Sequence, residues 1–409
     1  MSALICLLGI AVLVGIAFAS SVNRSAVNWR TVGFALLLQA LLGALVLYVP
    51  VGRLLLETLT QGVGQILGYA KDGIAFMFGD MAYSDKMGFI FAFQVLPAII
   101  FFSSLISILY YVGVMQWIVR FIGGGLSKLL RTTPEESLAS ATNIFVGQTE
   151  APIAIRPYLS RMTSSELFAV MVCGLCSVAG ATMAGYVAIG VDLKYLIAAS
   201  FMAAPGGLAM AKLVLPATTD DTRGLPEEVD ETEDETPANV FDAAAQGATN
   251  GMMLAVNVGA MLIAFVAIIA MFNGGLGWLG SLVGFADVSI EGLLGYVFSP
   301  IAWLIGVPWA EATQAGSYIG QKLVLNEFLA YINLVANGES LSVHTRAVVT
   351  FALCGFANFS SIAILLGGLG VMAPTRRAEI ARLGMRALLA ATLANLMSAA
   401  IASFFLHLA

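Results

Sequence analysis

The chain is dominated by continuous apolar runs that are long enough to cross a bilayer as helices. Clear examples cover residues 3–19, 32–50, 88–112 and 250–272. A transmembrane helix needs about 20 mostly apolar residues in a row, whereas the strands of a membrane barrel alternate apolar and polar positions. The pattern therefore predicts an all-α polytopic membrane protein.

Three other stretches mix apolar and charged positions. They cover residues 51–80, 113–134 and about 285–300. In the first of them, Arg53 and Glu57 flank a run of three leucines. A helix with one apolar and one charged face lies in the plane of the membrane interface and does not cross the bilayer. We therefore expect interfacial helices in these stretches.

Two apolar segments each carry one acidic residue. Glu150 lies in NIFVGQTEAPIAI (143–155) and Glu327 lies in QKLVLNEFLAYINL (321–334). A carboxylate at membrane depth costs about 3 kcal/mol even on lenient insertion scales. The central Pro152 favours a helix–turn–helix hairpin over one straight helix, and irregular backbone at this depth must be buried in protein or line a cavity. The two segments therefore predict re-entrant hairpins that hold something polar.

The order of a hairpin, a broken helix and a further span occurs twice. Residues 168–191 resemble residues 348–371, with Ser177 aligned on Asn358. Chance similarity among Gly- and Ala-rich helices is the alternative, but the shared polar interruptions favour a repeat. Inverted repeats with discontinuous helices place a binding site near the middle of the bilayer.

These patterns predict eight transmembrane helices, two opposed re-entrant hairpins, interfacial helices and an inverted repeat. The chain divides into five predicted parts: scaffold helices with an interfacial helix (1–112), an interfacial stretch with the first repeat (113–215), an acidic cytoplasmic linker (216–248), a scaffold span with an interfacial helix (249–311) and the second repeat (312–409). The first repeat consists of a hairpin (136–161), a broken helix (165–190) and a span (196–215). The second consists of a hairpin (312–335), a broken helix (347–371) and a span (388–408).

Composition agrees with a membrane protein. Of the 409 residues, 59% are hydrophobic and only 11% are charged, and the mean hydropathy is +0.91. The net charge of −6 comes largely from residues 219–237, which hold nine of the 25 acids. We interpret this segment as a solvated linker, with a regulatory or metal-binding tail as the alternative. Nothing in the composition indicates nucleic acid binding.

The four cysteines all lie in apolar stretches and are interpreted as small packing residues. One pair, Cys173 and Cys176, has the C-x-x-C spacing of redox and metal motifs. No histidine lies near this pair in the sequence, so the spacing alone is weak evidence for either chemistry. His344 and His407 flank or end helices, and no histidine-based catalytic centre is visible.

Basic clusters set the predicted orientation. Arginine and lysine gather at residues 24–30, 120–131, 156–161 and 376–386, and such clusters face the cytoplasm. Eight spans satisfy this rule only if neither hairpin crosses the bilayer. Both termini are then expected on the periplasmic side of a bacterial inner membrane.

Polar side chains concentrate at the points where helical structure is interrupted. Gln148, Thr149 and Glu150 can converge in an unwound hairpin tip, although neighbours on an intact helix point in different directions. Ser177 and Asn358 mark the matching interruptions in the broken helices. For single Ser or Asn residues the alternative is helix–helix association. For the two glutamates it is a structural charge pair with Arg156 or Lys322.

The motifs of the chain resemble those of the concentrative nucleoside transporters, in an order that covers nearly the whole sequence. The matching segments are NIFVGQTEAP (143–152), SELFAVM (165–171), AASFMAAPGG (198–207), GQKLVLNEF (320–328) and CGFANFSSIAILLGGLG (354–370). The small number of N-terminal spans is similar to the bacterial branch.

The resemblance implies a homotrimer in membrane lipid that carries a nucleoside by an elevator-like movement, without a cofactor other than Na⁺ as coupling ion. Thr182 departs from the small apolar residue expected at its position, which bears on the preferred nucleoside. The implied roles are contacts to the nucleobase for Gln148, Thr149 and Glu150, contacts to the ribose for Glu327, Asn358 and Ser361, flanking positions for Thr182 and Phe356, and a Na⁺ site for Asn143, Val146, Ser177 and Val178.

Other functions remain as alternatives. The GQTEAP sequence is similar to the sodium-coupled members, and proton coupling is the second possibility for the ion. A channel would need a ring of polar residues around a symmetry axis, whereas the polar residues here lie in repeats within one chain. An intramembrane enzyme would need a nucleophile–base pair or a metal set, and the sequence shows neither.

Overall fold

The computed structural model describes residues 2–83, 86, 88–218, 237–282 and 288–408, and every regular element in this part of the chain is helical. The helices of the first half are α1 (Ser2–Ala19), η1 (Arg24–Ala26), α2 (Trp29–Leu47), α3 (Pro50–Phe78), η2 (Gly79–Ala82), α5 (Phe91–Gln94), α6 (Leu96–Tyr111), α7 (Val114–Leu130), α8 (Pro134–Thr142), η3 (Ala151–Tyr158), α9 (Ser164–Cys176), α10 (Gly180–Ala188) and α11 (Leu193–Val214). Those of the second half are α12 (Val240–Leu282), α13 (Ile290–Leu304), α14 (Trp309–Val324), α15 (Glu327–Asn337), η4 (Gly338–Ser340), α16 (Val343–Leu353), α17 (Phe359–Met372), η5 (Pro374–Arg376) and α18 (Arg377–Leu406).

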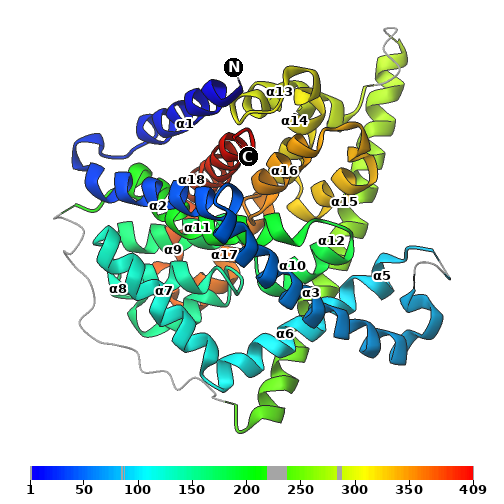
Figure 1. Cartoon of the computed structure of the whole chain (residues 1–409), viewed down its shortest axis with the longest axis horizontal. Helices are drawn as coiled ribbons and strands as arrows, with labels where there is room; N and C mark the ends of the chain where they lie inside the picture. The colour runs from blue at the N-terminus through cyan, green and yellow to red at the C-terminus, as the bar shows by residue number, and fades with distance from the viewer. Residues whose placement is uncertain (1, 84–85, 87, 219–236, 283–287, 409) are drawn as a thin grey trace.

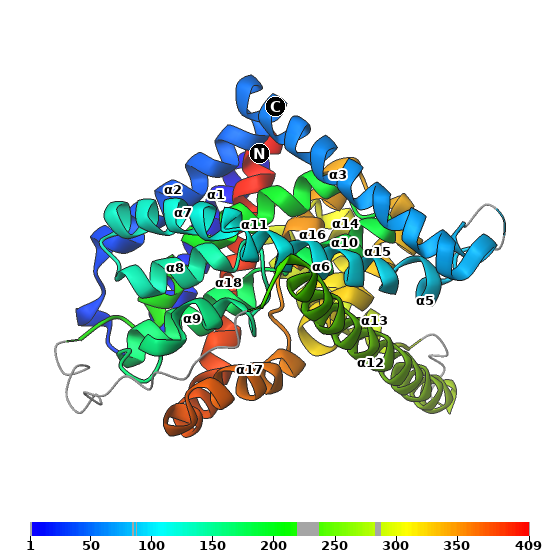
Figure 2. The same cartoon turned by 90° about the horizontal axis from the view of Figure 1, so that it is seen from below.

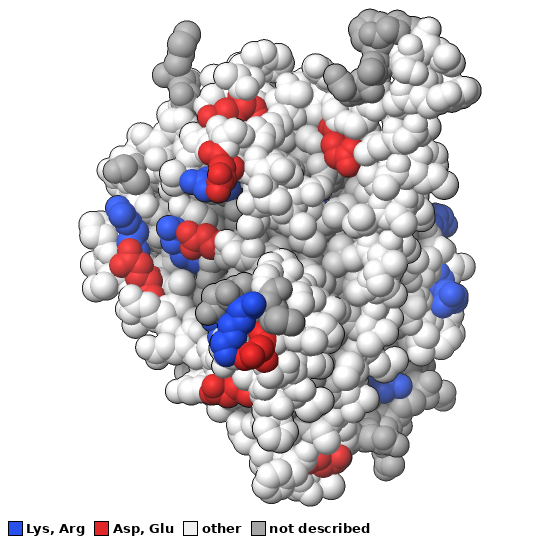
Figure 3. All heavy atoms as spheres, turned by 90° about the vertical axis from the view of Figure 1, so that its right-hand side faces the viewer, with Lys and Arg blue, Asp and Glu red and all other residues white. Residues whose placement is uncertain are grey.

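The predicted all-α membrane class is confirmed. Six described helices are long and apolar enough to cross a membrane, and the pair α13–α14, bent by 115°, would add a seventh if it formed one span. Shorter apolar helices cover Ala3–Ala19, Val343–Leu353 and Phe359–Met372. The face in Figure 3 is mostly uncharged, and its acidic and basic side chains form separate small groups, mostly in the left half of the view with further basic ones along the right-hand edge. The count of eight spans stays a prediction.

The long helices fall into a buried group and a peripheral group. In the most apolar windows of α9–α10 and α11, 94% of the residues are buried inside the protein, against 17% in those of α5–α6 and α12. Figures 1 and 2 show α12 at the edge of the molecule, while α11 and α18 run through its centre. The repeats therefore form the core, and α6 and α12 present their sides to whatever surrounds the chain.

The peripheral pair is held together by small residues. Gly247 and Gly251 are spaced as a G-x-x-x-G motif on α12, and a Cβ at either position would lie 2.6–2.8 Å from atoms of Ser107 or Ile100 on α6. In a membrane, small residues at this spacing let two helices approach closely, and dispersion contacts then stabilise the pair. The two helices form one packed edge of the protein.

The first hairpin consists of α8 and η3. Its outgoing arm begins with a capping box, in which the Thr133 amide donates to the Glu136 carboxylate at 2.9 Å. The returning arm is a 3₁₀ helix and not the α-helix that we expected. Pro152 and Pro157 lack backbone N–H groups, so they cannot continue a regular α-helical ladder.

The second hairpin consists of α14 and α15, which meet at Leu325 and Asn326. It begins at Trp309, whereas residue 312 was predicted. Helix α12 likewise extends from Val240 to Leu282, well beyond the predicted 250–272. In the predicted linker over 216–248, residues 219–236 lie outside the described part of the chain, so only its flanks are seen.

Both predicted broken helices are interrupted. Helix α9 stops at Ser177 and α10 begins at Gly180, while α16 stops at Cys354 and α17 begins after Asn358. The sequence alignment placed Ser177 opposite Asn358, but Ser177 ends the first half of its helix and Asn358 caps the second half of the other. The second interruption is longer, which explains why a fixed offset in sequence does not match the caps.

The two interruptions cross and are bonded to each other. The Phe356 amide donates to the Ser177 carbonyl at 3.1 Å. The buried Asn395 of α18 donates from one amide nitrogen to the Cys176 carbonyl at 2.6 Å and to the Cys354 carbonyl at 2.8 Å. Carbonyls at helix ends have no partner within the helix and need one from elsewhere. Asn395 supplies that partner for both half-helices at once.

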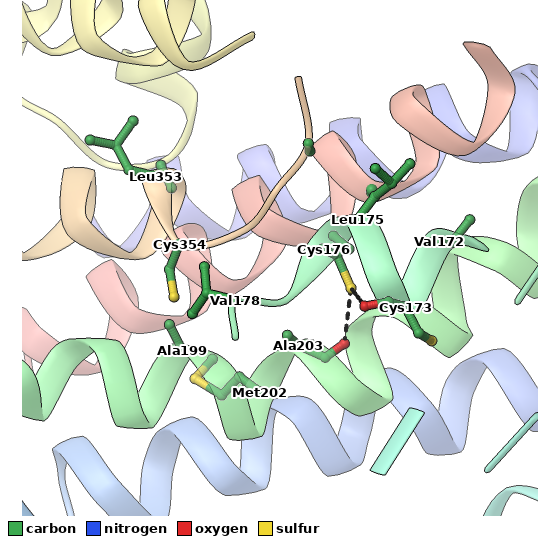
Figure 4. Packing of buried hydrophobic residues seen from close by; sticks show 14 of the residues in the cluster. Val172, Cys173, Leu175, Cys176, Val178, Ala199, Met202, Ala203, Leu353 and Cys354 are labelled. Atoms are coloured by element: carbon green, nitrogen blue, oxygen red, sulfur yellow. Dashed lines mark hydrogen bonds between the residues drawn. The ribbon is translucent and has the colours of Figure 1, made fainter. Parts of the chain in front are cut away.

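Three of the four cysteines, Cys173, Cys176 and Cys354, lie at or near this crossing, while Cys6 lies beside Ser403. Figure 4 shows Cys176 and Cys354 near Val178 of the first interruption and near Ala199 and Met202 of α11. All four cysteines are buried and free. The Cys176 thiol donates to the carbonyls of Cys173 and Ala203, at 3.6 and 3.4 Å. The C-x-x-C spacing therefore serves packing against α11 in this structure.

Gly355 tests how tightly the crossing is packed. It has φ +155°, and a Cβ there would lie 2.5 Å from the Asn395 amide oxygen. We expect Gly355→Ala to lower the stability of the purified protein by about 1–3 kcal/mol, as overpacking does, in a thermal melt in detergent. Gly367→Ala is the control, since a Cβ there meets no atom within 4 Å. Equal melting temperatures for the two variants would contradict the close contact.

Candidate functional site

The hairpin tips and the broken helices enclose a cavity of about 620 Å³. Its wall is built from the tip of the first hairpin, α10, α12, the start of α15 and the start of α17. The structure brings together in this wall all eight residues expected to contact the substrate, namely Gln148, Thr149, Glu150, Thr182, Glu327, Phe356, Asn358 and Ser361.

Glu327 is held in a fixed position by hydrogen bonds. It is 5% exposed. Its carboxylate accepts from the Tyr186 hydroxyl at 2.9 Å and from the Asn358 amide at 2.8 Å. Asn358 is itself fixed, because its oxygen accepts from the Ser361 backbone amide at 2.9 Å as the N-cap of α17. The carboxylate has about four acceptor positions, so it can accept further hydrogen bonds from a ligand.

The first hairpin contributes polar atoms that lack protein partners. The oxygens of the Gln148 amide and the Thr182 hydroxyl are buried and have no hydrogen-bond partner among the described residues. Glu150 lies at the tip with its side chain accessible, and it accepts only a long bond of 3.4 Å from the Gly147 amide. Buried polar groups are normally bonded. A cavity with such unpaired groups is therefore suited to a polar ligand.

A second group of unpaired oxygens lies behind the tip. The Asn143 amide donates to the Ala139 carbonyl at 2.9 Å, which leaves its buried oxygen without a donor. That oxygen lies near the last turn of α9, since a Cβ on Gly174 would be 3.8 Å from it. No backbone amide in the described part of the chain donates to the carbonyls of Val146 or Val178.

These oxygens fit the expected ion site. Hard cations take oxygen ligands from amides, backbone carbonyls and hydroxyls. The Ser177 hydroxyl donates to the Cys173 carbonyl at 2.9 Å, so its lone pairs remain free. The Gly180 amide also donates to the Phe145 carbonyl at 2.9 Å, which joins the hairpin tip to the start of α10. The geometry is thus compatible with a small cation between the tip and the broken helix.

The sequence analysis did not identify several residues of the cavity. Asn250 and Asn257 of α12, seven residues apart and so on one helix face, line it, as does Asn326 at the start of α15. Tyr186 was also missed, although it holds Glu327. Amides inside an otherwise apolar run such as α12 are unusual and could have been singled out.

One alternative is corrected by the structure. Lys322 makes no direct salt bridge or hydrogen bond with Glu327. Its ammonium donates to the Ala352 carbonyl at 2.8 Å and to the Asn395 amide oxygen at 2.7 Å. Glu327 is therefore free of a direct lysine contact and faces the cavity with its polar partners.

An all-α membrane fold with a polar cavity between two interrupted helices is the architecture of secondary transporters. Comparison with known proteins agrees. Models for the Na⁺-dependent nucleoside transporters match residues 8–81 for the N-terminal part and 195–403 for the C-terminal part, and a nucleoside recognition model matches residues 92–192.

Individual proteins and structures point the same way. The nucleoside permease NupC of Helicobacter pylori is 46% identical, with 100% of this chain and 99% of that protein covered. A structure of a CNTnw double variant in an outward-facing state has a TM-score of 0.97 at 53% identity and covers both chains fully. The inward-facing, substrate-bound state of CNTnw has a TM-score of 0.94 at 52% identity, over 99% of this chain and 98% of that one. The chain belongs to the family of concentrative, Na⁺-dependent nucleoside transporters and is not an enzyme.

The unpaired Thr182 hydroxyl allows a test of whether this side chain contacts the ligand in the cavity. A buried hydroxyl without a partner destabilises the empty protein, so Thr182→Val should leave the melting temperature unchanged or raise it. If the hydroxyl bonds a nucleoside, the same variant should weaken uridine binding by about threefold to tenfold, the value of one ordinary hydrogen bond. Calorimetric titration of purified protein measures the affinity. Unchanged affinity would place the hydroxyl outside the binding contacts.

Proposed function

We propose that the protein takes up nucleosides such as uridine by coupling their entry to inward Na⁺ movement. The observation that carries this proposal is the convergence of carboxylates, amides and hydroxyls from both repeats on one cavity. A nucleoside is neutral and rich in hydroxyl, amide and ring-nitrogen groups. The described cavity wall has no lysine or arginine, which an anionic ligand would require.

The two ends of the nucleoside would meet different repeats. Glu327, Asn358 and Ser361 come from the second repeat and suit the ribose, because a carboxylate accepts from two neighbouring hydroxyls. Gln148, Thr149 and Glu150 come from the first hairpin and suit the base edge, whose donors and acceptors an amide can match. Thr182 and Phe356 would flank the ligand.

Coupling would follow from the position of the ion site. Asn143 and Val146 precede Gln148 to Glu150 directly in the sequence, so an ion bound to them would order the loop that meets the base. Ser177 and Val178 would complete the coordination. Binding of either species then favours the same tip conformation, and such coupling is reciprocal. Proton coupling through Glu150 is the alternative, but it gives no role to the unpaired oxygens behind the tip.

Transport would proceed by an elevator-type alternating-access mechanism, in which the cavity opens to one side of the membrane and then to the other. The buried hairpins and broken helices would move as a unit against the peripheral helices α6 and α12. Structures of CNTnw have been solved in outward-facing, intermediate and inward-facing states. The similarity of this chain to all three supports the proposal that it also changes between such states.

The exposed sides of α6 and α12 favour a homotrimer surrounded by membrane lipid. We place the protein in a bacterial inner membrane with both termini in the periplasm. The termini lie close together in Figures 1 and 2, and the Cys6 thiol donates to the Ser403 hydroxyl at 3.3 Å. If both termini lie on the same side of the membrane, the chain crosses the membrane an even number of times.

Glu327→Gln tests the ribose contact. An amide accepts at one end only, and hydrogen bonds to charged groups contribute about 1.5–3 kcal/mol. We expect uridine uptake into proteoliposomes to fall at least about tenfold, with protein yield and melting temperature close to those of the unchanged protein. Near-normal uridine affinity in this variant would exclude Glu327 from the ribose site.

Asn143→Ala tests the ion site. The variant removes one hard oxygen, so half-maximal uptake should need several-fold more external Na⁺ while the maximal rate at saturating Na⁺ changes less. Uptake is measured at fixed pH with choline replacing Na⁺. Uptake that follows pH and ignores Na⁺ would assign the coupling to protons.

A further inference from the structure

A second cavity adjoins the binding cavity. Its volume of about 410 Å³ lies within the range of about 300–1,000 Å³ that is usual for small-molecule sites. Glu150, Ala179 and Asn250 line both cavities and therefore mark their common boundary. The remaining wall of the second cavity comes from α6, α7, α10, α12 and the first hairpin. Helix α7 contributes nothing to the binding cavity, so the second cavity extends away from the substrate.

The wall of the second cavity carries polar side chains that are not bonded to the protein. Within the described chain, six of them form no side-chain hydrogen bond or ion pair, namely Ser103, Ser107, Tyr110, Gln116, Arg120 and Asn250. The Tyr110 hydroxyl and the Gln116 amide oxygen are also buried. Because buried polar groups are normally bonded, a wall with so many free donors and acceptors is suited to a ligand rich in polar groups.

Arg120 distinguishes this cavity from the binding cavity. Its side chain is exposed and has no acidic partner among the described residues. No lysine or arginine lies in the described wall of the binding cavity. A guanidinium binds phosphate through two parallel charge-assisted hydrogen bonds. Of the two adjoining cavities, therefore, only the second can match an anionic ligand.

The other side chains of the second cavity suit a nucleoside. Glu150, at the boundary with the binding cavity, can accept from neighbouring ribose hydroxyls. The Gln116 amide offers both a donor and an acceptor to the edge of a base. The rings of Tyr110 and Phe145 provide apolar surface for the base. Since Glu150 lies at the boundary and Arg120 belongs to α7, the two charges lie in different parts of the wall, and a ligand with a ribose and a phosphate can meet both.

We propose that the second cavity binds a nucleoside 5′-monophosphate from the cytoplasm and that this binding inhibits uptake. The basic cluster over residues 120–131 places α7 on the cytoplasmic side. Phosphorylation of an imported nucleoside would supply the ligand there, so its accumulation would slow further uptake. This inference rests on the proposed nucleoside uptake, and it deepens that function by adding its regulation.

Inhibition would follow from the elements that form the wall. Tyr110 of α6 and Asn250 of α12 belong to the peripheral helices, whereas Phe145 and Glu150 belong to the first hairpin, which moves in the proposed mechanism. A ligand that bonds both sides favours the conformation in which it is bound, in proportion to its higher affinity for that state. The maximal rate should therefore fall, while external uridine still binds in its own cavity.

The first test asks whether UMP and uridine bind together. UMP is titrated by calorimetry into purified protein that is already saturated with uridine in Na⁺. We expect one UMP per chain without release of labelled uridine, and one equivalent of uridine in the absence of UMP. Absence of UMP binding would overturn the proposal, as would release of one uridine for each UMP. Failure of uridine itself to bind would instead contradict the proposed function.

Inorganic phosphate tests the recognition of the nucleoside part. Phosphate alone should bind far more weakly than UMP, because it does not reach Gln116 or Glu150. Equal affinities for phosphate and UMP would show an anion site without nucleoside recognition, and this result would also overturn the proposal.

Variants of α7 test the residues. Arg120→Gln should weaken UMP binding about tenfold or more, the value of a hydrogen bond to a charged group, and leave uridine affinity unchanged. Gln116→Leu should weaken UMP binding about threefold to tenfold. Lys128→Gln is the matched control, since it removes a positive charge from an exposed residue of the same helix that does not line the cavity. Equal losses in Arg120→Gln and Lys128→Gln would show only a general attraction of anions to α7.

Uptake into proteoliposomes tests the inhibition. UMP enclosed in the vesicles at a saturating concentration should remove most of the maximal rate of uridine uptake and leave the half-saturating uridine concentration unchanged. Arg120→Gln should restore the rate. A higher half-saturating concentration at an unchanged maximal rate would place UMP in the binding cavity and contradict the proposal. Inhibition that occurs in phosphatidylcholine vesicles and disappears when phosphatidylglycerol is included would assign Arg120 to lipid phosphate, which would also contradict it.

Discussion

The structure depends on how backbone carbonyls are satisfied at membrane depth. Two helices stop in the middle of the protein, and each leaves carbonyls that water cannot reach. Asn395 bonds one carbonyl from each helix and is itself bonded by Lys322. An unsatisfied group in this setting costs several kcal/mol. The interruptions can therefore persist only because α14 and α18 bring these two side chains to the crossing.

Functional geometry follows from the same interruptions. Where α10 and α17 restart, their first residues lie beside the hairpin tips, so side chains from four segments reach one cavity. Asn358 illustrates the link, since it caps α17 and also orients the Glu327 carboxylate. The cap that stabilises a helix end thus positions a binding group. Unpaired oxygens at Asn143, Gln148 and Thr182 are the atoms that the proposed ion and solute would bind.

Long apolar runs predicted the helical class. Part of the cavity could be predicted because a polar residue at an interruption in an apolar run stands out, whereas the positions of Thr182 and Phe356 were expected only from the family resemblance. Glu150, Glu327 and Asn358 all have this signature. Asn395 does not, because a single amide in a continuous apolar helix looks the same whether it joins two helices or caps two carbonyls. Lys322 was weighed as a partner of glutamate, and only the three-dimensional crossing shows its carbonyl partners. The returning arm of the first hairpin is a 3₁₀ helix that contains Pro152 and Pro157. Local propensity does not specify which conformation two such prolines impose on a chain that turns back inside the protein.

The central claim is that one cation and one nucleoside bind to adjacent parts of the same hairpin and stabilise each other. Calorimetric titration of uridine into purified protein, in Na⁺ and then in choline at constant pH and ionic strength, tests it most directly. We expect uridine to bind at least about tenfold more tightly in Na⁺, a coupling within the usual range between linked sites. Equal affinity in the two salts would contradict the account.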